Sequence, residues 1–339
     1  MTLALVLSGA ALALLVALRS ASPMLGLVDR PGGRKQHDGG IPVVGGIAVA
    51  GATLLAGLVH GLCAAEWTII LGMLAHMLLG ALDDRWPLPA AMRLGFHGGI
   101  EGCTAALLLS QLWAVPPGFA SMAILALGAV LVCNALNMLD GMDGLAGGVA
   151  FIALACVMII NPSEYALPWL TACALVPFLF MNMGWLGPKV FLGDAGSMSL
   201  GHVVFWSLLP ASPDVRGEGA WAPYLWPMAL PVLDTAAVIS SRLFSGQSPL
   251  QADRLHIHHL LQDAGIGPRA SLAILLAAAV SLFGVGRLVL PLAYSYELLI
   301  WMGAFAACCL TRGWLRREAV RRGRLNQVKA TACQHGKKP

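Results

Sequence analysis

The segment EWTIILGMLAHMLLGALDD, residues 66–84, decides the fold class of this chain. Residues 66–82 are predominantly apolar and come close to the roughly 20 residues that a helix needs to cross the core of a bilayer. The run ends in two adjacent carboxylates, Asp83 and Asp84. We therefore expect a membrane-spanning helix that carries an acid pair at its end.

The composition of the whole chain agrees with this reading. Of its 339 residues, 58% are hydrophobic and only 11% are charged, with a mean hydropathy of +0.76. A soluble globular protein carries roughly 25% charged residues. So little charge excludes a soluble enzyme, a disordered protein and a small disulfide scaffold. The eight cysteines lie mostly inside apolar runs without metal-ligand spacing, so we interpret them as small buried apolar side chains.

Similar apolar runs recur on both sides of the opening segment, separated by short links. They predict an all-α polytopic membrane protein with about eleven transmembrane helices. The predicted helices cover residues 2–18, 41–62, 66–82, 96–113, 119–137, 145–161, 165–186, 196–210, 221–241, 269–290 and 294–311. We expect one transmembrane domain over residues 1–311, followed by a basic cytoplasmic tail over residues 312–339.

The basic residues predict which way the chain crosses the membrane. If the eleven helices alternate, all but two of the 21 lysines and arginines, Arg216 and Arg287, fall on one face. The positive-inside rule makes that face cytoplasmic, so the N-terminus is expected outside and the C-terminus inside. The first segment has no basic residues before it, so we interpret it as a retained helix.

Acidic residues gather on the same predicted face, although the positive-inside rule does not require carboxylates there. They are Asp29, Asp38, Asp83, Asp84, Asp140, Asp143, Asp194, Asp253, Asp263 and Glu318. Loops tolerate charge anyway, which is the simpler explanation. The motifs around these residues favour instead a polar site at the inner membrane surface.

Three of these motifs gather carboxylates or amides, and two of them, Asp83-Asp84 and the motif with Asp194, would suit a divalent cation. Adjacent carboxylates repel, so Asp83-Asp84 is best tolerated beside a cation or a basic partner, although helix ends also carry such pairs without function. The stretch NALNMLDGMDGLAGG, residues 134–148, repeats Asn or Asp every three residues, a spacing that shares one helix face. In KVFLGDAGSMSLG, residues 189–201, Asp194 precedes a helix start that Ser197 could cap, and backbone N–H groups there favour a phosphate.

Basic and histidine-rich segments predict an anion clamp. The stretch ADRLHIHHLL, residues 252–261, lacks the spacing of a zinc protease motif, so it suits a phosphate or sugar better than a metal. RKQHDGGIPVVGG, residues 34–46, either anchors the second helix or contacts phosphate. Asp234 lies inside the ninth predicted helix and is a functional candidate by its position, with Arg242 as a candidate partner. Glu101 lies inside the fourth predicted helix and is a weaker functional candidate than Asp234.

Taken together, these motifs resemble the polyprenyl-phosphate N-acetylhexosamine-1-phosphate transferase family, glycosyltransferase family 4. They extend from residue 28 to about residue 262 and follow the order of the family. The HIHH form resembles the bacterial branch that uses undecaprenyl phosphate and UDP-N-acetylglucosamine. The branch that uses UDP-N-acetylmuramoyl-pentapeptide has three consecutive histidines there.

The resemblance implies an enzyme that transfers N-acetylglucosamine-1-phosphate from the UDP-sugar to undecaprenyl phosphate and releases UMP. The product, a lipid-diphosphate-linked sugar, starts cell-envelope polysaccharide synthesis. The implied location is a bacterial inner membrane with the active site on its cytoplasmic face. A homodimer is left open, and no nucleic acid partner is expected. Another UDP-N-acetylhexosamine or UDP-N-acetylmuramoyl-pentapeptide is the alternative substrate. A transporter is a third reading, but it should hold its charges near the midplane of broken helices.

The resemblance also implies roles for individual residues. Mg²⁺, or Mn²⁺, is expected on Asn137 and Asp194. The implied catalytic residues are Asp83, Asp84 and Asp140. The implied contacts to nucleotide, sugar and phosphates are Asp143, Asn182, Lys35, Arg93, Arg242, Arg254, His256, His258 and His259. A phosphate monoester with a second pKa near ~6 is largely a dianion at neutral pH, so we expect direct attack by the lipid phosphate without an aspartyl-phosphate intermediate.

Overall fold

The computed structural model describes residues 2–30, 39–112, 118–160, 166–208, 225–249, 254–289 and 294–335, with side chains of the last helix up to residue 323. Lys35 and Asp253 lie outside these residues. The first half of the chain forms α1 (Thr2–Leu25), β1 (Val28–Asp29), β2 (Ile41–Pro42), α2 (Gly45–His60), α3 (Ala64–Arg85), α4 (Ala90–Leu112) and α5 (Phe119–Leu139). The second half forms α6 (Leu145–Ile160), α7 (Leu167–Asn182), α8 (Gly193–Leu208), η3 (Trp226–Met228), α10 (Ala229–Phe244), α11 (Ile257–Asp263), α12 (Pro268–Val289) and α13 (Tyr294–His335).

The apolar pattern predicted these helices well. Each of the eleven expected segments lies largely within a helix, and α11 is an additional short helix in the segment that carries the histidines. Within the described ranges, five helices are long and apolar enough to cross a membrane: α1, α3, α5, α12 and residues 295–323 of α13. Helices α2, α6 and α7 are apolar but shorter. The chain is therefore an all-α, multi-pass membrane protein.

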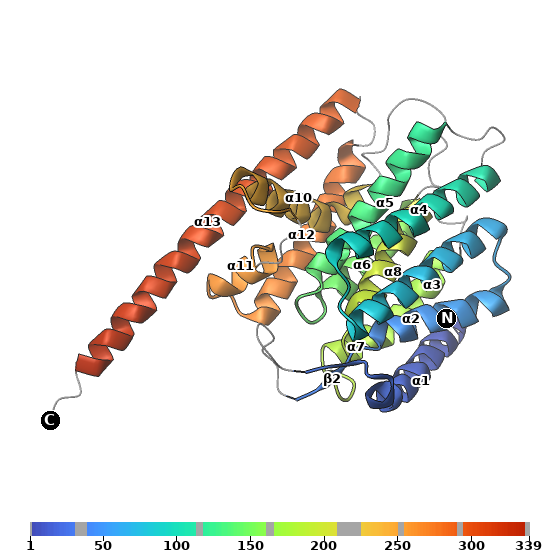
Figure 1. Ribbon diagram of the computed structural model, residues 1–339, viewed down its shortest axis with the longest axis horizontal. Helices are drawn as coiled ribbons and strands as arrows, with labels where there is room; N and C mark the ends of the chain where they lie inside the picture. The colour runs from blue at the N-terminus through green and yellow to red at the C-terminus, as the bar shows by residue number, and fades with distance from the viewer. Residues whose placement is uncertain are drawn as a thin grey trace.

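Helix α8 is the centre of the bundle, with α2, α3, α5 and α6 packed around it (Figure 1). Every residue from Ala195 to Leu208 is buried. Glycines allow its first turn to approach two neighbours closely. A Cβ at Gly46 would lie 2.1 Å from the Cα of Gly196, and a Cβ at Gly80 would lie 2.2 Å from the backbone nitrogen of Ala195. Small residues permit such backbone contacts between membrane helices.

A short hydrogen-bonded segment holds the start of α8 against α2. The strands β1 and β2 pair antiparallel, with Val28 opposite Pro42. The backbone N–H of Phe191 donates to Pro42 over 2.8 Å, and Gly45 donates back to Phe191 over 2.9 Å. These bonds place the KVFLGDAGS segment beside the entry to α2, at the same end of the bundle as the end of α3.

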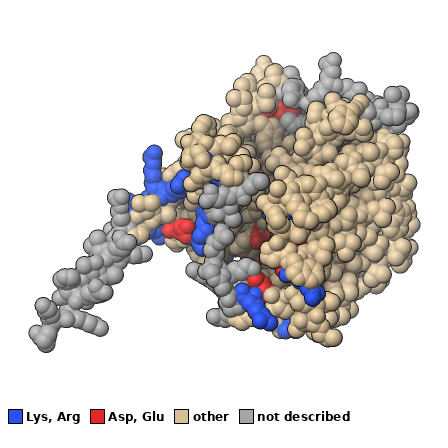
Figure 2. Space-filling model, in the orientation of Figure 1, with Lys and Arg blue, Asp and Glu red and all other residues tan. Residues whose placement is uncertain are grey.

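Helix α13 extends away from the bundle as a single long helix that ends near the C-terminus (Figure 1). The expected boundary between residues 311 and 312 falls inside it. Figure 2 shows that most of this face of the molecule is uncharged, and that most charged groups gather toward one end, around a recess beside α13. The predicted polar site lies at that end.

Candidate active site

The carboxylate of Asp84 binds the N-terminus of helix α8. Its two oxygens accept hydrogen bonds from the backbone N–H groups of Asp194, over 3.1 Å, and Ala195, over 3.3 Å. A negative charge is favourable at this end of a helix because unpaired N–H groups and the helix dipole point at it. Ser197, the residue expected to cap this helix, instead donates from its hydroxyl to the carbonyl of Gly193 one turn earlier. Asp84 supplies the cap from another helix.

Asp83 faces a different set of partners. It is 6% exposed and accepts hydrogen bonds from Arg93, over 2.6 Å, and from the backbone N–H of Leu88, over 2.7 Å. The same nitrogen of Arg93 lies 3.6 Å from an oxygen of Asp194. Arg93, expected to contact phosphate, thus links the end of α3 to the start of α8.

The two residues expected to hold the cation are in direct contact. The side-chain amide of Asn137 donates to a carboxylate oxygen of Asp194 over 2.8 Å and to the hydroxyl of Ser197 over 3.0 Å. These bonds use the NH₂ group of Asn137, so its carbonyl oxygen is the atom suited to a cation. The resemblance to the family, and not the spacing of the motif, paired Asn137 with Asp194, and the two side chains are in contact.

Burial and mutual repulsion perturb the carboxylates of this cluster. Burial, together with the charges of Asp194, Asp84 and Asp143, raises the pKa of Asp140 to about 8. Burial, the charge of Asp84 and a hydrogen bond to Asp83 raise the pKa of Asp194 to about 7. Carboxylates that resist ionisation together become ionised readily when a divalent cation binds them. Several carboxylates and an amide oxygen are the hard ligands that suit Mg²⁺.

Asn182 fastens two loops of the site together. Its side-chain oxygen accepts from the backbone N–H of Gly144 over 2.6 Å, and its NH₂ group donates to the carbonyl of Val190 over 3.0 Å. The side chain is 6% exposed. Nearby, Lys189 forms an ion pair with Asp143. Sequence analysis did not single out Lys189, although it opens the motif that contains Asp194.

The first histidine of the HIHH motif, His256, is oriented by a carboxylate on helix α10. Nδ1 of His256 lies 2.8 Å from Asp234, whose other oxygen accepts from the backbone N–H of Ile257 over 3.0 Å and pairs with Arg312. The expected partner, Arg242, instead donates to the carbonyl of Pro249 over 2.6 Å. Arg312 was missed because it lies in the segment interpreted as a tail, and no local pattern distinguishes it from its basic neighbours.

His258 lies against the aspartate loop. A Cβ at Gly141 would lie 2.3 Å from Nε2 of His258, so the ring contacts the backbone between Asp140 and Asp143. The ring is 1% exposed, and neither of its nitrogens has a hydrogen-bond partner among the described residues. Burial, next to His259, lowers the pKa of His258 to about 3. An unpaired buried ring is costly, so this position suits a ligand that hydrogen-bonds to it.

His259 and Arg254, from the same ADRLHIHHLL segment, are more exposed than His258. Burial and the nearby charge of Arg254 lower the pKa of His259, whose ring centroid is 4.1 Å from that of His258. The guanidinium of Arg254 lies 3.4 Å from Asp263, and both side chains are more than two-fifths exposed. The structure thus brings His258 to the aspartates and leaves Arg254 at the surface.

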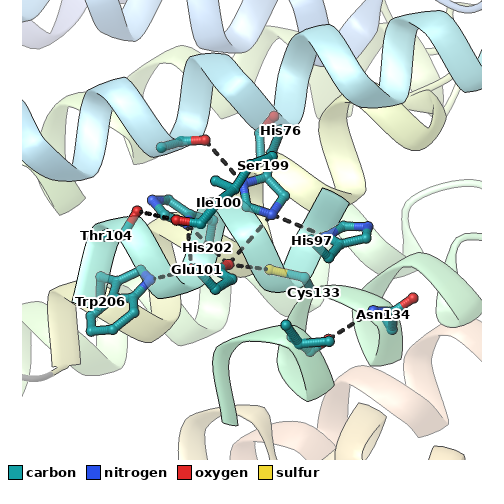
Figure 3. Close-up of polar contacts among 12 residues, drawn as sticks. His76, His97, Ile100, Glu101, Thr104, Cys133, Asn134, Ser199, His202 and Trp206 are labelled. Atoms are coloured by element: carbon teal, nitrogen blue, oxygen red, sulfur yellow. Dashed lines mark hydrogen bonds and ion pairs between the residues drawn. The ribbon is translucent and has the colours of Figure 1, made fainter. Parts of the chain in front are cut away.

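A second polar cluster lies inside the bundle, around Glu101 (Figure 3). Glu101 is fully buried and contacts His202, Trp206 and Cys133. His76 lies 3.4 Å from it. Sequence analysis ranked Glu101 below Asp234 and did not consider these histidines. Histidines are unusual within apolar membrane helices, and this feature of the sequence could have identified them as candidates.

The fold and the site define a class of protein: a multi-pass membrane protein with a cluster of carboxylates at one end, beside a buried histidine suited to an anion. Comparison with known proteins identifies the family. Residues 67–211 match the model of glycosyl transferase family 4. The chain is 33% identical to a protein of Escherichia coli K12, over 90% of this chain and 89% of that relative. It is 30% identical to a Yersinia pestis protein, over 96% and 95%, and 31% identical to a Pasteurella multocida protein, over 93% and 94%.

All three relatives are named undecaprenyl-phosphate alpha-N-acetylglucosaminyl 1-phosphate transferase. The chain belongs to glycosyl transferase family 4. The resemblance inferred from the motifs is therefore confirmed.

Proposed function

We propose that this enzyme transfers N-acetylglucosamine-1-phosphate from UDP-N-acetylglucosamine to undecaprenyl phosphate. The observation that carries the proposal is the cluster of three carboxylates, Asp84, Asp140 and Asp194, with the amide of Asn137. Beside it lies His258, whose ring nitrogens have no hydrogen-bond partner in the described part of the chain. A diphosphate with a divalent cation is the ligand that this combination suits. Relatives with that printed activity, aligned over nearly the full chain, supply the substrate.

We assign Mg²⁺, or Mn²⁺, to Asn137 and Asp194, with Asp140 and Asp84 adjacent. The raised pKa values of Asp140 and Asp194 support this assignment, because a cation relieves the repulsion that causes them. When bound, the ion neutralises the charge of the diphosphate during phosphoryl transfer.

The reaction joins an oxygen of the lipid phosphate to the β-phosphorus of the UDP-sugar. The bond from that phosphorus to the oxygen that bridges to the α-phosphate breaks, and the oxygen leaves with UMP. We favour direct attack because the lipid phosphate is largely a dianion at neutral pH, with a second pKa near ~6. Asp83 and Asp84 support this choice, since both already hold partners, Arg93 and the start of α8, and so act in positioning. Trapping a phosphorylated aspartate from UDP-sugar without lipid would contradict it.

The chain's other residues bind and orient. Arg93, which donates to Asp83 and lies 3.6 Å from Asp194, is proposed to meet the lipid phosphate, and Lys35 is proposed for the same role from its motif. Asp143 is proposed for uracil, in a loop that Asn182 holds in place. His258, held against the Asp140 loop, is proposed to donate to the diphosphate once it is protonated or in the right tautomer.

His256 and His259 complete this clamp, with Asp234 fixing the tautomer of His256. We assign Arg242 and Arg254 to the clamp from the motif. The contact of Arg254 with Asp263 at the surface would then have to open.

The proposed arrangement in the membrane keeps eleven spans, with the N-terminus outside and the C-terminus in the cytoplasm of a bacterium. The site then lies on the cytoplasmic face, where the UDP-sugar is available, and residues 312–339 form a basic cytoplasmic tail. Homodimerisation remains a hypothesis. The site lies at one end of the bundle, which favours an enzyme that draws one substrate from the cytosol over a transporter.

The direct test is release of UMP from UDP-N-acetylglucosamine by the purified chain, with polyprenyl phosphate and Mg²⁺. We expect no release when either is omitted. A panel that includes other UDP-N-acetylhexosamines and UDP-N-acetylmuramoyl-pentapeptide then determines the sugar. No release with any of them would contradict the enzyme assignment and favour transport.

A further inference from the structure

The cluster around Glu101 joins the four helices that carry the acidic site. His76 lies on α3, Glu101 on α4, Cys133 on α5 and His202 on α8. On each helix, the cluster residue lies four to eight positions from a residue of the acidic site, about 6–12 Å along the helix axis. The cluster is thus a separate centre, deeper in the bundle than the acidic site.

Glu101 is surrounded by side chains in contact with its carboxylate. One oxygen lies 3.2 Å from Sγ of Cys133 and 3.4 Å from Nε2 of His76. The other accepts from the indole N–H of Trp206 over 2.6 Å. Nδ1 of His202 lies 3.1 Å from both oxygens. Each of these side chains is buried, and Figure 3 shows them converging on Glu101.

Backbone carbonyls determine the tautomers of two of the histidines. Nδ1 of His76 lies 3.0 Å from the carbonyl of Gly72, and Nε2 of His202 lies 3.2 Å from the carbonyl of Ile69. A carbonyl only accepts, so each of these nitrogens carries hydrogen. In a neutral ring the opposite nitrogen is then a lone pair, and that of His202 faces a carboxylate that also only accepts. A positive species, either a proton on Nδ1 of His202 or a metal ion at the carboxylate, is needed to remove this repulsion.

We propose that a transition-metal ion, Zn²⁺ by its ligand set, is bound here by His76, Glu101 and Cys133, while His202 contacts the same carboxylate. The ligand atoms of His76, Glu101 and Cys133 all lie within 4.8 Å of one another. Tetrahedral zinc with ordinary bond lengths has ligand atoms about 3.4–3.6 Å apart. The separations of Glu101 from Cys133, 3.2 Å, and from His76, 3.4 Å, come close to these values.

Two further features fit a metal centre. Histidines that bind a metal ordinarily donate from their other nitrogen to a carbonyl or carboxylate, as His76 does here to the carbonyl of Gly72. A divalent ion with one carboxylate and one thiolate is also neutral overall, which suits the interior of a membrane protein. The hydrogen bond of His97 to His76, 3.0 Å long, is the contact that the ion would replace.

Thiolate and imidazole ligands select zinc over Mg²⁺, so this centre is distinct from the proposed magnesium site. Its place in the molecule assigns it a structural role. By joining α3, α4 and α5, with α8 attached through the contact of His202 with Glu101, it would hold Asp83, Arg93, Asn137 and Asp194 at their mutual distances. The ion would make the geometry of the acidic site less dependent on packing alone.

The test is the metal content of the purified chain, prepared without a histidine tag or chelating resin. We expect about one zinc ion per chain, and loss of at least nine-tenths of it in both Glu101→Gln and Cys133→Ser. Cys156→Ser is the matched control, because Cys156 is a buried cysteine outside the cluster, and it should retain zinc. After exchange for Co²⁺, the parent chain should show a sulfur-to-cobalt charge-transfer band that Cys133→Ser lacks.

A parent chain that carries no zinc and takes up neither Zn²⁺ nor Co²⁺ would overturn the proposal. Unchanged zinc in both variants would overturn it too, because the metal would then lie elsewhere. If Glu101→Gln does not fold, the measurements on the parent chain and on Cys133→Ser still decide. The readout is metal content, so it is independent of the UMP assay.

Discussion

Replacing Asp194 by Asn tests the acidic site most sharply. Asn has almost the same shape and retains an oxygen that can accept from Asn137, so the local hydrogen bonds over 2.8 Å can persist. The substitution removes one negative charge from a cluster in which Asp84 and Asp83 already disfavour ionisation. We therefore expect the variant to fold and insert normally but to lose Mg²⁺ affinity and turnover, by about 10³-fold or more.

The pKa of Asp194 gives the size of the effect on stability. A rise from 3.8 to about 7 corresponds to about 4 kcal/mol, an upper value because 32% of the side chain is exposed to solvent. A carboxyl with a raised folded-state pKa binds more protons in the folded than in the unfolded state. In chelator, the parent chain should therefore lose stability as pH rises from about 4 to about 8, the range set by Asp194 and Asp140.

The loss of stability with pH can be measured by thermal unfolding in detergent at several pH values, with chelator or with Mg²⁺. Saturating Mg²⁺, at 100 times its Kd, should restore about 2.7 kcal/mol at pH 8 and less at pH 6. Asp194→Asn should show a flatter pH profile and little response to Mg²⁺. Asp263→Asn, which changes an exposed carboxylate, should behave as the parent chain. An Asp194→Asn variant with normal turnover, or with the full Mg²⁺ response, would remove Asp194 from the site.

Three further substitutions test other parts of the structure. His258→Ala should raise the KM for the UDP-sugar about tenfold, because the ring lies against the Asp140 loop, while the KM for lipid phosphate changes little; equal changes would argue against its assigned role. Asp234→Asn should lower kcat and destabilise the chain by about 3 kcal/mol, since it leaves Arg312 buried without its counter-ion; an unchanged melting temperature would exclude that pairing. Gly80→Ala should reduce both melting temperature and UMP release, because its Cβ would meet the first turn of α8 at 2.2 Å, and a fully active, equally stable variant would contradict this contact.

Local patterns were enough to predict the helices and to single out the acidic motifs, whose roles were inferred from the resemblance to the family. The apolar run before Asp83 forms a helix because a long apolar segment in a bilayer must satisfy its backbone groups internally. Asn137 and Asp194 were paired through the resemblance to the family, and the structure brings them into contact at 2.8 Å. That contact is consistent with a shared cation, whose presence remains a prediction.

Contacts between distant segments were not predictable in this way. Asp84 caps a helix that begins more than a hundred residues later, and Arg312 pairs with Asp234 from a segment that looks like a basic tail. Asn182 was expected to line a nucleotide pocket, but in the structure both groups of its amide bind backbone. Each of these contacts depends on which helices lie side by side. Many arrangements of the helices bury nearly the same apolar surface, so the hydrophobic pattern does not select one of them.

Composition and spacing along one helix were thus sufficient for the class of protein, the positions of the apolar helices and the residues of the acidic motifs. Only the tertiary structure decided that α8 lies at the centre, that Gly80 and Gly46 admit it, and that Glu101 collects His76, Cys133 and His202 from three other helices. The physical reason is that burial and electrostatic interaction depend on distance in space. Each buried polar group in this chain reaches its hydrogen-bond partner only after the helices have packed together.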